Sequence, residues 1–453
     1  MTLHDAKLYP INRETRVVTT KARTRRTSLR PLPSFVQLSS VSRESTIRPT
    51  IMPPTTMPAS IVFLSTYPPR QCGLATFTAA LYAHLISSDL INSVQPGRRA
   101  GRIGVVRVIE SGEDANDESG AVVGYLVNGS ETSSRAAVRV LNGYDSVIVQ
   151  HEYGIYGGPD GEDVLDIVES LTVPVIVVLH TVLVDPTAHQ REILNRLVRA
   201  ADTVVTMTET GRTRLEELYG VAATRISVIP HGAIDHRSTR HDPRKAGARP
   251  VVLTWGLLGP GKGIEWAIDA MVGLRDLNPR YRVVGKTHPK VLEHEGEHYR
   301  LSLIERAHRL GISDLMEFDA SYVSVPQLAV LVQSADVVLL PYDSPDQVTS
   351  GVLIEAVAAG RPVVSTAFPH AVELLAGGSG IFVPQRDSDA ISEAVRRVLT
   401  EPALAKSMAG HAAAQAPALV WGVVAERYRA LVEALVTASR GVADHAAMQV
   451  VPL

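Results

Sequence analysis

The sequence has little cysteine, little net charge and no long apolar run, and each of these features excludes a class of protein. Its single cysteine, Cys72, excludes a disulfide within the chain and fits a reducing compartment. A formal net charge of −2 argues against a dedicated nucleic-acid-binding protein. The longest apolar run, residues 173–184, is interrupted by Pro174 and His180 and is too short to span a bilayer. Since the N-terminus also lacks the apolar centre of a secretory signal, we expect a cytoplasmic protein.

The composition is that of an ordinary globular protein, with 45% hydrophobic and 20% charged residues among 453. This length predicts roughly two or three domains. Residues 1–57 differ from the rest because they are rich in arginine, serine, threonine and proline, so we interpret them as a disordered basic tail. An organellar transit peptide and a start codon assigned too early, before Met52 or Met57, remain open as alternatives.

Apolar runs of strand length alternate with helical periodicity through the rest of the chain, which predicts an α/β fold with parallel sheets. We expect an N-terminal domain over residues 58–236, a polar linker over 236–248 and a C-terminal domain over 249–415. The predicted strands lie at residues 61–65, 103–108, 146–150, 173–179, 203–207, 226–229, 251–255, 281–285, 316–319, 336–341, 361–365 and 380–384. A long amphipathic helix at 418–436 is expected to pack back across both domains.

The clearest unit is the stretch from Asp336 to Ser365, in which a strand, a polar loop, a helix and a second strand follow one another. Ligands bind such sheets at the carboxyl ends of the strands. Thr349 or Ser350 is a suitable N-cap, and free N–H groups at a helix start favour a phosphate. Glu355 lies one turn further on among apolar residues, where it would bind a ribose diol or simply be an exposed glutamate.

Residues 256–263, Gly-Leu-Leu-Gly-Pro-Gly-Lys-Gly, follow a predicted strand and open a helix. They match a phosphate-binding loop, except that Gly263 stands where Ser or Thr would hold magnesium. Backbone amides and Lys262 would still bind a diphosphate without metal; a plain turn with a solvated lysine is the alternative. Asp387 and Asp389 have the spacing of a manganese pair but are better explained as helix-capping residues, so we expect no metal site.

Three histidines follow predicted strands: His151, His180 and His231. The carboxyl ends of parallel strands meet at one edge of a sheet, so we expect these side chains to converge there. Each would then donate a hydrogen bond to a sugar hydroxyl or a leaving phosphate, although a structural histidine bonded to backbone explains any single one equally well.

Taken together, these residues resemble the retaining glycosyltransferases of family 4, which have the GT-B architecture of two Rossmann-like domains facing a central cleft. The resemblance covers residues 61–436 and is strongest in Gln347-x-x-Ser350-Gly351-x-x-x-Glu355-Ala-x-Ala-x-Gly360-x-Pro362-Val-Val. It is supported by Ile229-Pro-His-Gly-Ala-Ile-Asp235, by Val204-Val-Thr-Met-Thr-Glu209 and by glycine loops at Gly73 and Gly256.

The family resemblance implies transfer of a sugar from a nucleotide-diphosphate sugar, of the GDP-mannose or UDP-glucose type, to a carbohydrate or lipid-linked acceptor. It implies no cofactor and no obligatory metal, and it leaves peripheral contact with a membrane open. The residues carried over to donor binding are Gly73, Gly256, Lys262, Lys286, Ser350, Gly351, Val352 and Glu355. Those carried over to catalysis are His180, with His151 as its rival, Lys262 and Gln347.

Three positions depart from the family pattern. Gln347 stands where the first glutamate is usual, Leu257 where an arginine is common, and His231 where asparagine is preferred. Lys286 or Arg70 would replace the arginine. An epimerase or glycosyl phosphorylase of the same architecture, and a catalytically silent sugar-nucleotide-binding relative, therefore remain alternatives.

Overall fold

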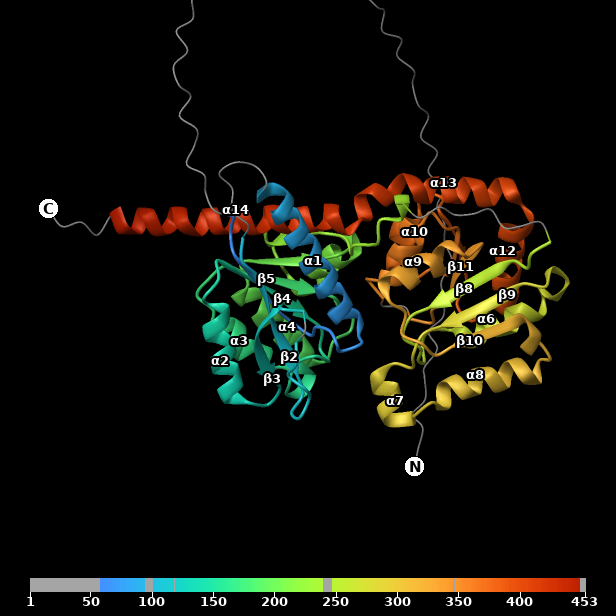
Figure 1. The fold of residues 1–453 in the computed structure, drawn as a ribbon, viewed down its shortest axis with the longest axis horizontal. Coiled ribbons are helices and arrows are strands. Elements are labelled where there is room, and N and C mark those ends of the chain that lie inside the picture. The colour runs from blue at the N-terminus through green and yellow to red at the C-terminus, as the bar shows by residue number, and fades with distance from the viewer. Residues whose placement is uncertain (1–57, 94–100, 118, 239–246, 345–346, 449–453) are drawn as a thin grey trace, which may run out of the picture. The chain divides into compact units, whose positions relative to one another are not determined.

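The computed structural model describes residues 58–93, 101–117, 119–238, 247–344 and 347–448. The predicted basic tail, residues 1–57, lies outside the described residues, as does most of the predicted linker. Within this part of the chain, two parallel sheets are flanked by helices (Figure 1). The predicted α/β architecture of two doubly wound sheets is confirmed.

The N-terminal lobe is built on the first sheet, which has seven strands in the order β3-β2-β1-β4-β5-β6-β7, all parallel. Its elements are β1 (Ile61–Ser65), α1 (Gly73–Ser93), β2 (Ile103–Ile109), β3 (Val122–Val127), α2 (Glu131–Leu141), β4 (Ser146–His151), α3 (Val164–Glu169), β5 (Val175–Leu179), α4 (Ala188–Ala200), β6 (Thr203–Thr206), α5 (Glu209–Tyr219) and β7 (Ile226–Val228). The strand order reverses direction between β1 and β4, which creates a switch point at the carboxyl edge.

The C-terminal lobe is built on a six-stranded parallel sheet with the order β10-β9-β8-β11-β12-β13. Its elements are β8 (Val251–Trp255), α6 (Ile264–Val272), β9 (Arg280–Val284), α7 (Pro289–Glu295), α8 (His298–Arg309), β10 (Met316–Asp319), α9 (Val325–Gln333), β11 (Val337–Leu340), α10 (Gly351–Ala358), β12 (Val363–Thr366), α11 (Pro369–Leu375), β13 (Gly380–Val383), α12 (Ser388–Thr400) and α13 (Pro402–Leu419). Here the order reverses between β8 and β11, so the loops after these two strands are neighbours.

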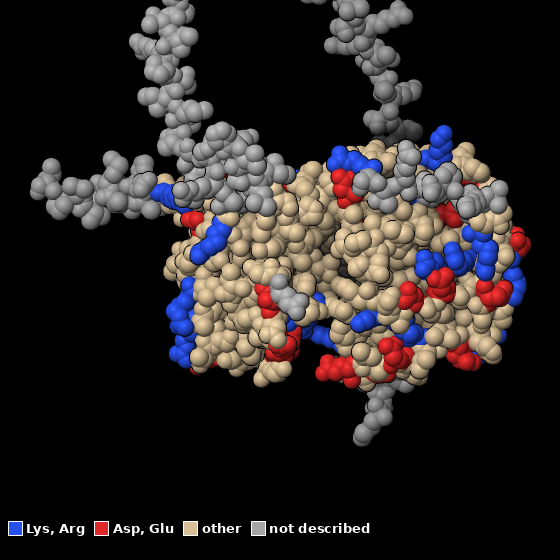
Figure 2. Space-filling view, in the orientation of Figure 1, with Lys and Arg blue, Asp and Glu red and all other residues tan. Residues whose placement is uncertain are grey.

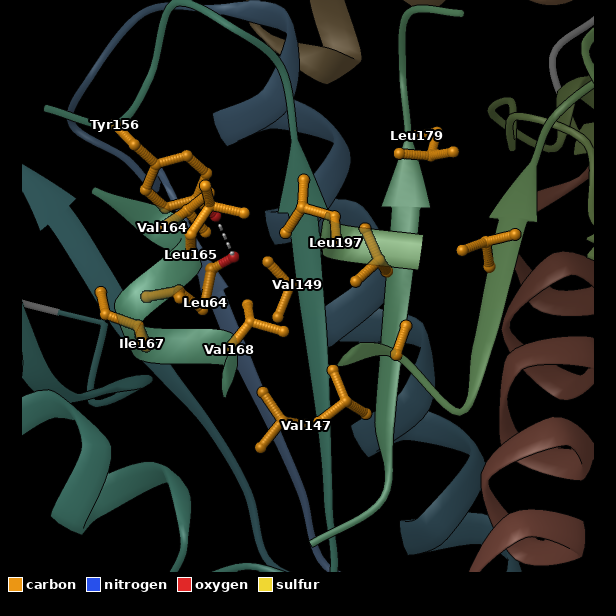
Figure 3. Packing of buried hydrophobic residues seen from close by; sticks show 14 of the residues in the cluster. Leu64, Val147, Val149, Tyr156, Val164, Leu165, Ile167, Val168, Leu179 and Leu197 are labelled. Atoms are coloured by element: carbon orange, nitrogen blue, oxygen red, sulfur yellow. Dashed lines mark hydrogen bonds between the residues drawn. The ribbon is translucent and has the colours of Figure 1, made fainter. Parts of the chain in front are cut away.

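The central strands of both sheets are buried on both faces, as expected of parallel sheets that are covered by helices. Figure 3 shows one side of the first sheet, where Val147 and Val149 of β4 pack with Leu165 and Val168 of α3. The Tyr156 hydroxyl, in the same cluster, donates to the Leu64 carbonyl oxygen at 3.3 Å. These cores hold the carboxyl ends of the strands in place.

A helix is present where one was expected over residues 418–436, but its boundaries differ. The helical conformation is interrupted at Val420, between α13 and α14 (Trp421–Met448), where Val420 forms a parallel bridge with Ala233. The Ala233 N–H donates to the Leu419 carbonyl at 2.8 Å, and the Trp421 N–H donates to the Ala233 carbonyl at 2.9 Å. As a result α13 packs on the C-terminal lobe, whereas α14 packs along α1 (Figure 1).

Charged side chains of both signs are interspersed on the face of the molecule that Figure 2 shows. Ion pairs in the C-terminal lobe include Arg396 with Asp276 at 2.6 Å and Arg282 with Glu317 at 2.8 Å. Among the described helices, none is long and apolar enough to cross a membrane.

Candidate functional site

The glycine-rich loop after β8 lies directly against the end of β11. Gly263, which precedes α6, has a left-handed φ of 63°, and a Cβ on it would lie 1.8 Å from the Pro341 carbonyl oxygen. The Asp343 N–H donates to the Gly261 carbonyl at 2.9 Å. Only glycine fits this approach, so the two loops at the switch point form one unit.

Lys262 extends from this loop over an aromatic ring. Its Nζ lies 4.3 Å from the centre of the Tyr342 ring, and Tyr342 is itself buried and stacked on Phe368. A cation over a ring face is attracted by the ring quadrupole, which fixes the ammonium group near the β11 end. The sequence could not identify this contact, although it did single out Lys262.

The amino end of α10 lies beside the same loop. A Cβ on Gly256 would lie 3.4 Å from Cγ2 of Val352 in the first turn of α10. Of the two predicted N-cap residues, Thr349 and Ser350, the structure uses Ser350, whose Oγ accepts the Leu353 N–H at 3.3 Å. The backbone N–H of Ser350 donates to Nδ1 of His370 at 2.8 Å, so this amide, one of three expected to meet phosphate, already has a partner.

Glu355 is buried, with 8% of its surface exposed, and the alternative of an exposed glutamate is therefore wrong. Both carboxylate oxygens lie 3.2 Å from the Ile234 N–H, and one lies 3.5 Å from Nε2 of His236. Burial raises the pKa of Glu355 above its ordinary value, while the nearby His236 ring opposes the shift. One backbone donor leaves lone pairs on the carboxylate for a further hydroxyl.

Gln347 and Lys286 both have partners within the protein. The Gln347 side-chain amide donates to the Thr349 carbonyl at 3.1 Å, inside its own loop. Lys286 donates to Oε1 of Gln71 at 2.7 Å, next to Gly73 at the start of α1. Lys286 therefore points to the first glycine loop of the N-terminal lobe.

The histidines of the N-terminal lobe do converge at one edge of its sheet. The Phe77 ring makes edge contacts with His180 at 4.9 Å and with His231 at 5.1 Å between ring centres. Burial, together with the charges that His231 and His151 would carry, lowers the pKa of His180 to about 3. Nε2 of His180 lies 2.7 Å from Oε1 of Gln150.

His151 and His180 differ in access. His151 is fully buried, and neither of its ring nitrogens has a hydrogen-bond partner among the described residues. Burial lowers its pKa to about 4. His180 is only partly buried, so of the two it is the more accessible to solvent.

Asp387 is the N-cap of α12 and its carboxylate accepts the Ala390 N–H at 2.8 Å, so the capping interpretation is confirmed. In the described part of the chain, no group of three or more His, Cys, Asp or Glu side chains is arranged to hold a metal ion.

Sequence reasoning missed two residues on α11. His370 binds the loop before α10, and Glu373 accepts the N–H groups of Glu209 and Thr210 at 2.9 Å, at the start of α5. A pocket of about 600 Å³ lies beside Glu373, Val372 and Thr210, and none of the sequence-assigned site residues lines it. Pro369 before an apolar run was the available signal for α11.

Two family models match the chain. A model of glycosyl transferases group 1 matches residues 235–415, and a model of glycosyltransferase family 4 matches residues 128–237. Together they cover more than half of the 453 residues. The first match contains the glycine-rich loop and α10, and the second contains the three histidines.

Curated relatives point the same way. The chain is 29% identical over 253 residues to D-inositol 3-phosphate glycosyltransferase of Kineococcus radiotolerans, covering 51% of this chain and 57% of that protein. It is 30% identical over 217 residues to glycogen synthase of Mycobacterium tuberculosis, covering 47% and 49%. The chain thus spans about half the length of the curated relatives it matches.

Solved structures share the fold at low identity. Anabaena HepE in complex with UDP superposes with a TM-score of 0.63 at 18% identity, covering 83% of this chain and 100% of that one. Sucrose-phosphate synthase of Thermosynechococcus elongatus gives 0.63 at 17%, covering 84% and 100%. The chain therefore belongs to glycosyltransferase family 4 and has the GT-B fold.

Proposed function

We propose that this protein is a retaining glycosyltransferase that moves a sugar from a nucleoside-diphosphate sugar to a hydroxyl acceptor. The observation that carries the proposal is the placement of Lys262 at the junction of the loop before α6 and the end of β11, with the amino end of α10 beside it. Backbone N–H groups and a lysine at one edge of a sheet are the elements that bind a diphosphate.

In the proposed reaction, Lys262 and the N–H groups at the start of α10 stabilise the negative charge that develops on the departing diphosphate. The acceptor hydroxyl attacks from the same face, and the leaving phosphate takes its proton. His180, partly buried and uncharged at neutral pH, orients the sugar. Glu355 has free lone pairs for the ribose hydroxyls.

The donor is proposed to be of the UDP-glucose or GDP-mannose type. UDP-glucose is supported by a structural neighbour, Anabaena HepE, which was solved in complex with UDP-glucose. The acceptor is proposed to be a carbohydrate or a lipid-linked sugar, and the location cytoplasmic. No metal is needed in this scheme, so EDTA should leave turnover unchanged.

The test begins with a thermal-shift screen of UDP, GDP, UDP-glucose and GDP-mannose, because a ligand that binds the native state raises its melting temperature. With the best donor, Lys262→Ala should lower the rate of nucleotide release by about 100-fold or more, the typical effect of removing one stabilising group. The melting temperature without ligand should fall by no more than a few degrees, because among the described residues only the contact with the Tyr342 ring is lost.

Lys406→Ala, which removes the same charge from an exposed position on α13, serves as the control and should keep full activity. Turnover of Lys262→Ala at the wild-type rate would contradict the proposal. Donor binding without any nucleotide release in the wild type would instead favour a catalytically silent relative, for which the departure at Gln347 provides a reason.

A further inference from the structure

His370 makes two hydrogen bonds to the loop that precedes α10, one at each end of residues 347–350. Its backbone N–H lies 3.4 Å from the Gln347 carbonyl oxygen, and its ring Nδ1 accepts the Ser350 N–H at 2.8 Å. His370 and Ser350 are each only 3% exposed. The loop from residue 347 to residue 350 is therefore fastened where it starts and where it turns into the helix.

The donor in this contact fixes the tautomer of the ring. A backbone amide only donates, so Nδ1 of His370 must be unprotonated, and the neutral ring then carries its proton on Nε2. Burial, with a smaller effect from His231, lowers the pKa of His370 to about 3. The ring consequently stays neutral, and Nδ1 stays an acceptor, throughout the neutral pH range.

This bond determines which amides remain for a ligand. The first N–H groups of a helix have no acceptor inside the helix. With the Ser350 N–H bound to His370 and the Leu353 N–H bound to the Ser350 hydroxyl, the N–H groups between them are those of Gly351 and Val352. A Cβ on Gly256 would lie 3.4 Å from Cγ2 of Val352, so the first turn of α10 lies beside the glycine-rich loop.

We propose that His370 is a positioning residue of the nucleotide-sugar site: by holding the Ser350 N–H it fixes the loop so that the Gly351 and Val352 N–H groups face the diphosphate. This inference rests on the proposed function, because it assumes that a diphosphate binds at α10. His370 acts through the loop and does not itself touch the reacting atoms.

The experiment replaces His370 by asparagine or glutamine, because the asparagine amide can occupy the position of Nδ1 and the glutamine amide that of Nε2. In His370→Asn, Oδ1 takes the place of Nδ1 and accepts the Ser350 N–H. In His370→Gln, the amide reaches the place of Nε2 and leaves the Ser350 N–H without its acceptor. His370→Ala removes both groups.

For each variant, the affinity for UDP and GDP is measured by calorimetry. KM and kcat are measured with the best donor, and the melting temperature is measured without ligand. We expect His370→Asn to bind within about threefold of the wild type. Gln and Ala variants should bind about tenfold more weakly or worse and show a raised KM, because a buried N–H loses its partner. Equal affinity of the Asn and Gln variants would overturn the inference.

A measurement on the unaltered protein keeps the inference testable if the variants do not fold. Nitrogen NMR of ¹⁵N-histidine-labelled protein should show His370 with its proton on Nε2 from pH 5 to 8; a proton on Nδ1 would overturn it. A wild type that binds none of the nucleotides refutes the proposed function itself. Loss of binding in Lys262→Ala but not in His370→Gln refutes only the role of His370.

Discussion

The close approach of Gly263 to Pro341 leads to a specific prediction about the glycine-rich loop before α6. A methyl group at position 263 would lie 1.8 Å from the carbonyl oxygen and 2.9 Å from the carbonyl carbon of Pro341, whereas real Cβ contacts stay above 3.0 Å. Because both partners are backbone, the clash cannot be relieved by rotating a side chain. In Gly263→Ala the loop and the end of β11 must therefore separate by roughly 1 Å.

Lys262 precedes this residue and would move with the loop. A displacement of about 1 Å in a group that positions substrate can lower the rate by about 100-fold. The left-handed φ of 63° adds a folding cost of about 1–2 kcal/mol for alanine. We expect Gly263→Ala to fold, to melt a few degrees lower, and to lose about two orders of magnitude in nucleotide release.

Gly261→Ala is the matched control. Gly261 also has a left-handed φ, of 85°, but no atom lies within 4 Å of the position that its Cβ would take. It should show the same conformational cost without the collision, and therefore keep most of its activity. Nucleotide release and thermal unfolding are measured on both variants. Equal losses in the two would mean that backbone strain, and not the contact with Pro341, controls the loop.

Two further predictions concern stability. Burial lowers the pKa of His151 to about 4 and that of His370 to about 3, so unfolded chains take up protons near pH 6.5 that the native protein does not. From pH 7.5 to 5.5 the free energy of unfolding, measured in urea, should fall by about 1 kcal/mol for each of these two histidines. His370→Asn should remove the contribution of His370 to this fall. A free energy of unfolding that stays constant over this pH range would refute the prediction. Gly232→Ala would place Cβ 2.2 Å from the Trp421 indole, so it should cost about 1–3 kcal/mol and change tryptophan fluorescence, whereas Gly422→Ala, in open space, should do neither.

The sequence was most informative where apolar runs and turn residues alternate. The strand predicted at 336–341 is β11, and the N-cap predicted at Thr349 or Ser350 is Ser350 of α10. Such local signals depend on periodicity and capping, which neighbouring residues determine. The same reasoning missed β3 at 122–127, an edge strand that is only partly buried and contains Gly124.

Contacts between residues far apart in the chain could not be predicted from the sequence. At Val420 the chain forms a bridge with Ala233, nearly 190 positions earlier, which the sequence could not predict, although Pro417 is a local signal for a helix end. Likewise, the sequence singled out Glu355 as a carboxylate among apolar residues and left an exposed position open, whereas its neighbours Ile234 and His236 are known only from the structure. Side-chain chemistry was predictable from the sequence, whereas the partner that each group already has was not.

The charges around Lys262 show why this distinction matters for function. Asp343, the carboxylate next to Tyr342, forms an ion pair with Arg386 at 2.7 Å. Among the residues that the structure describes, no carboxylate forms an ion pair with Lys262, which contacts the Tyr342 ring instead. An aromatic face orients an ammonium group without neutralising it, so the positive charge remains available to an anion. The same lysine paired with an aspartate would have to exchange one anion for another, and binding a diphosphate would then gain much less.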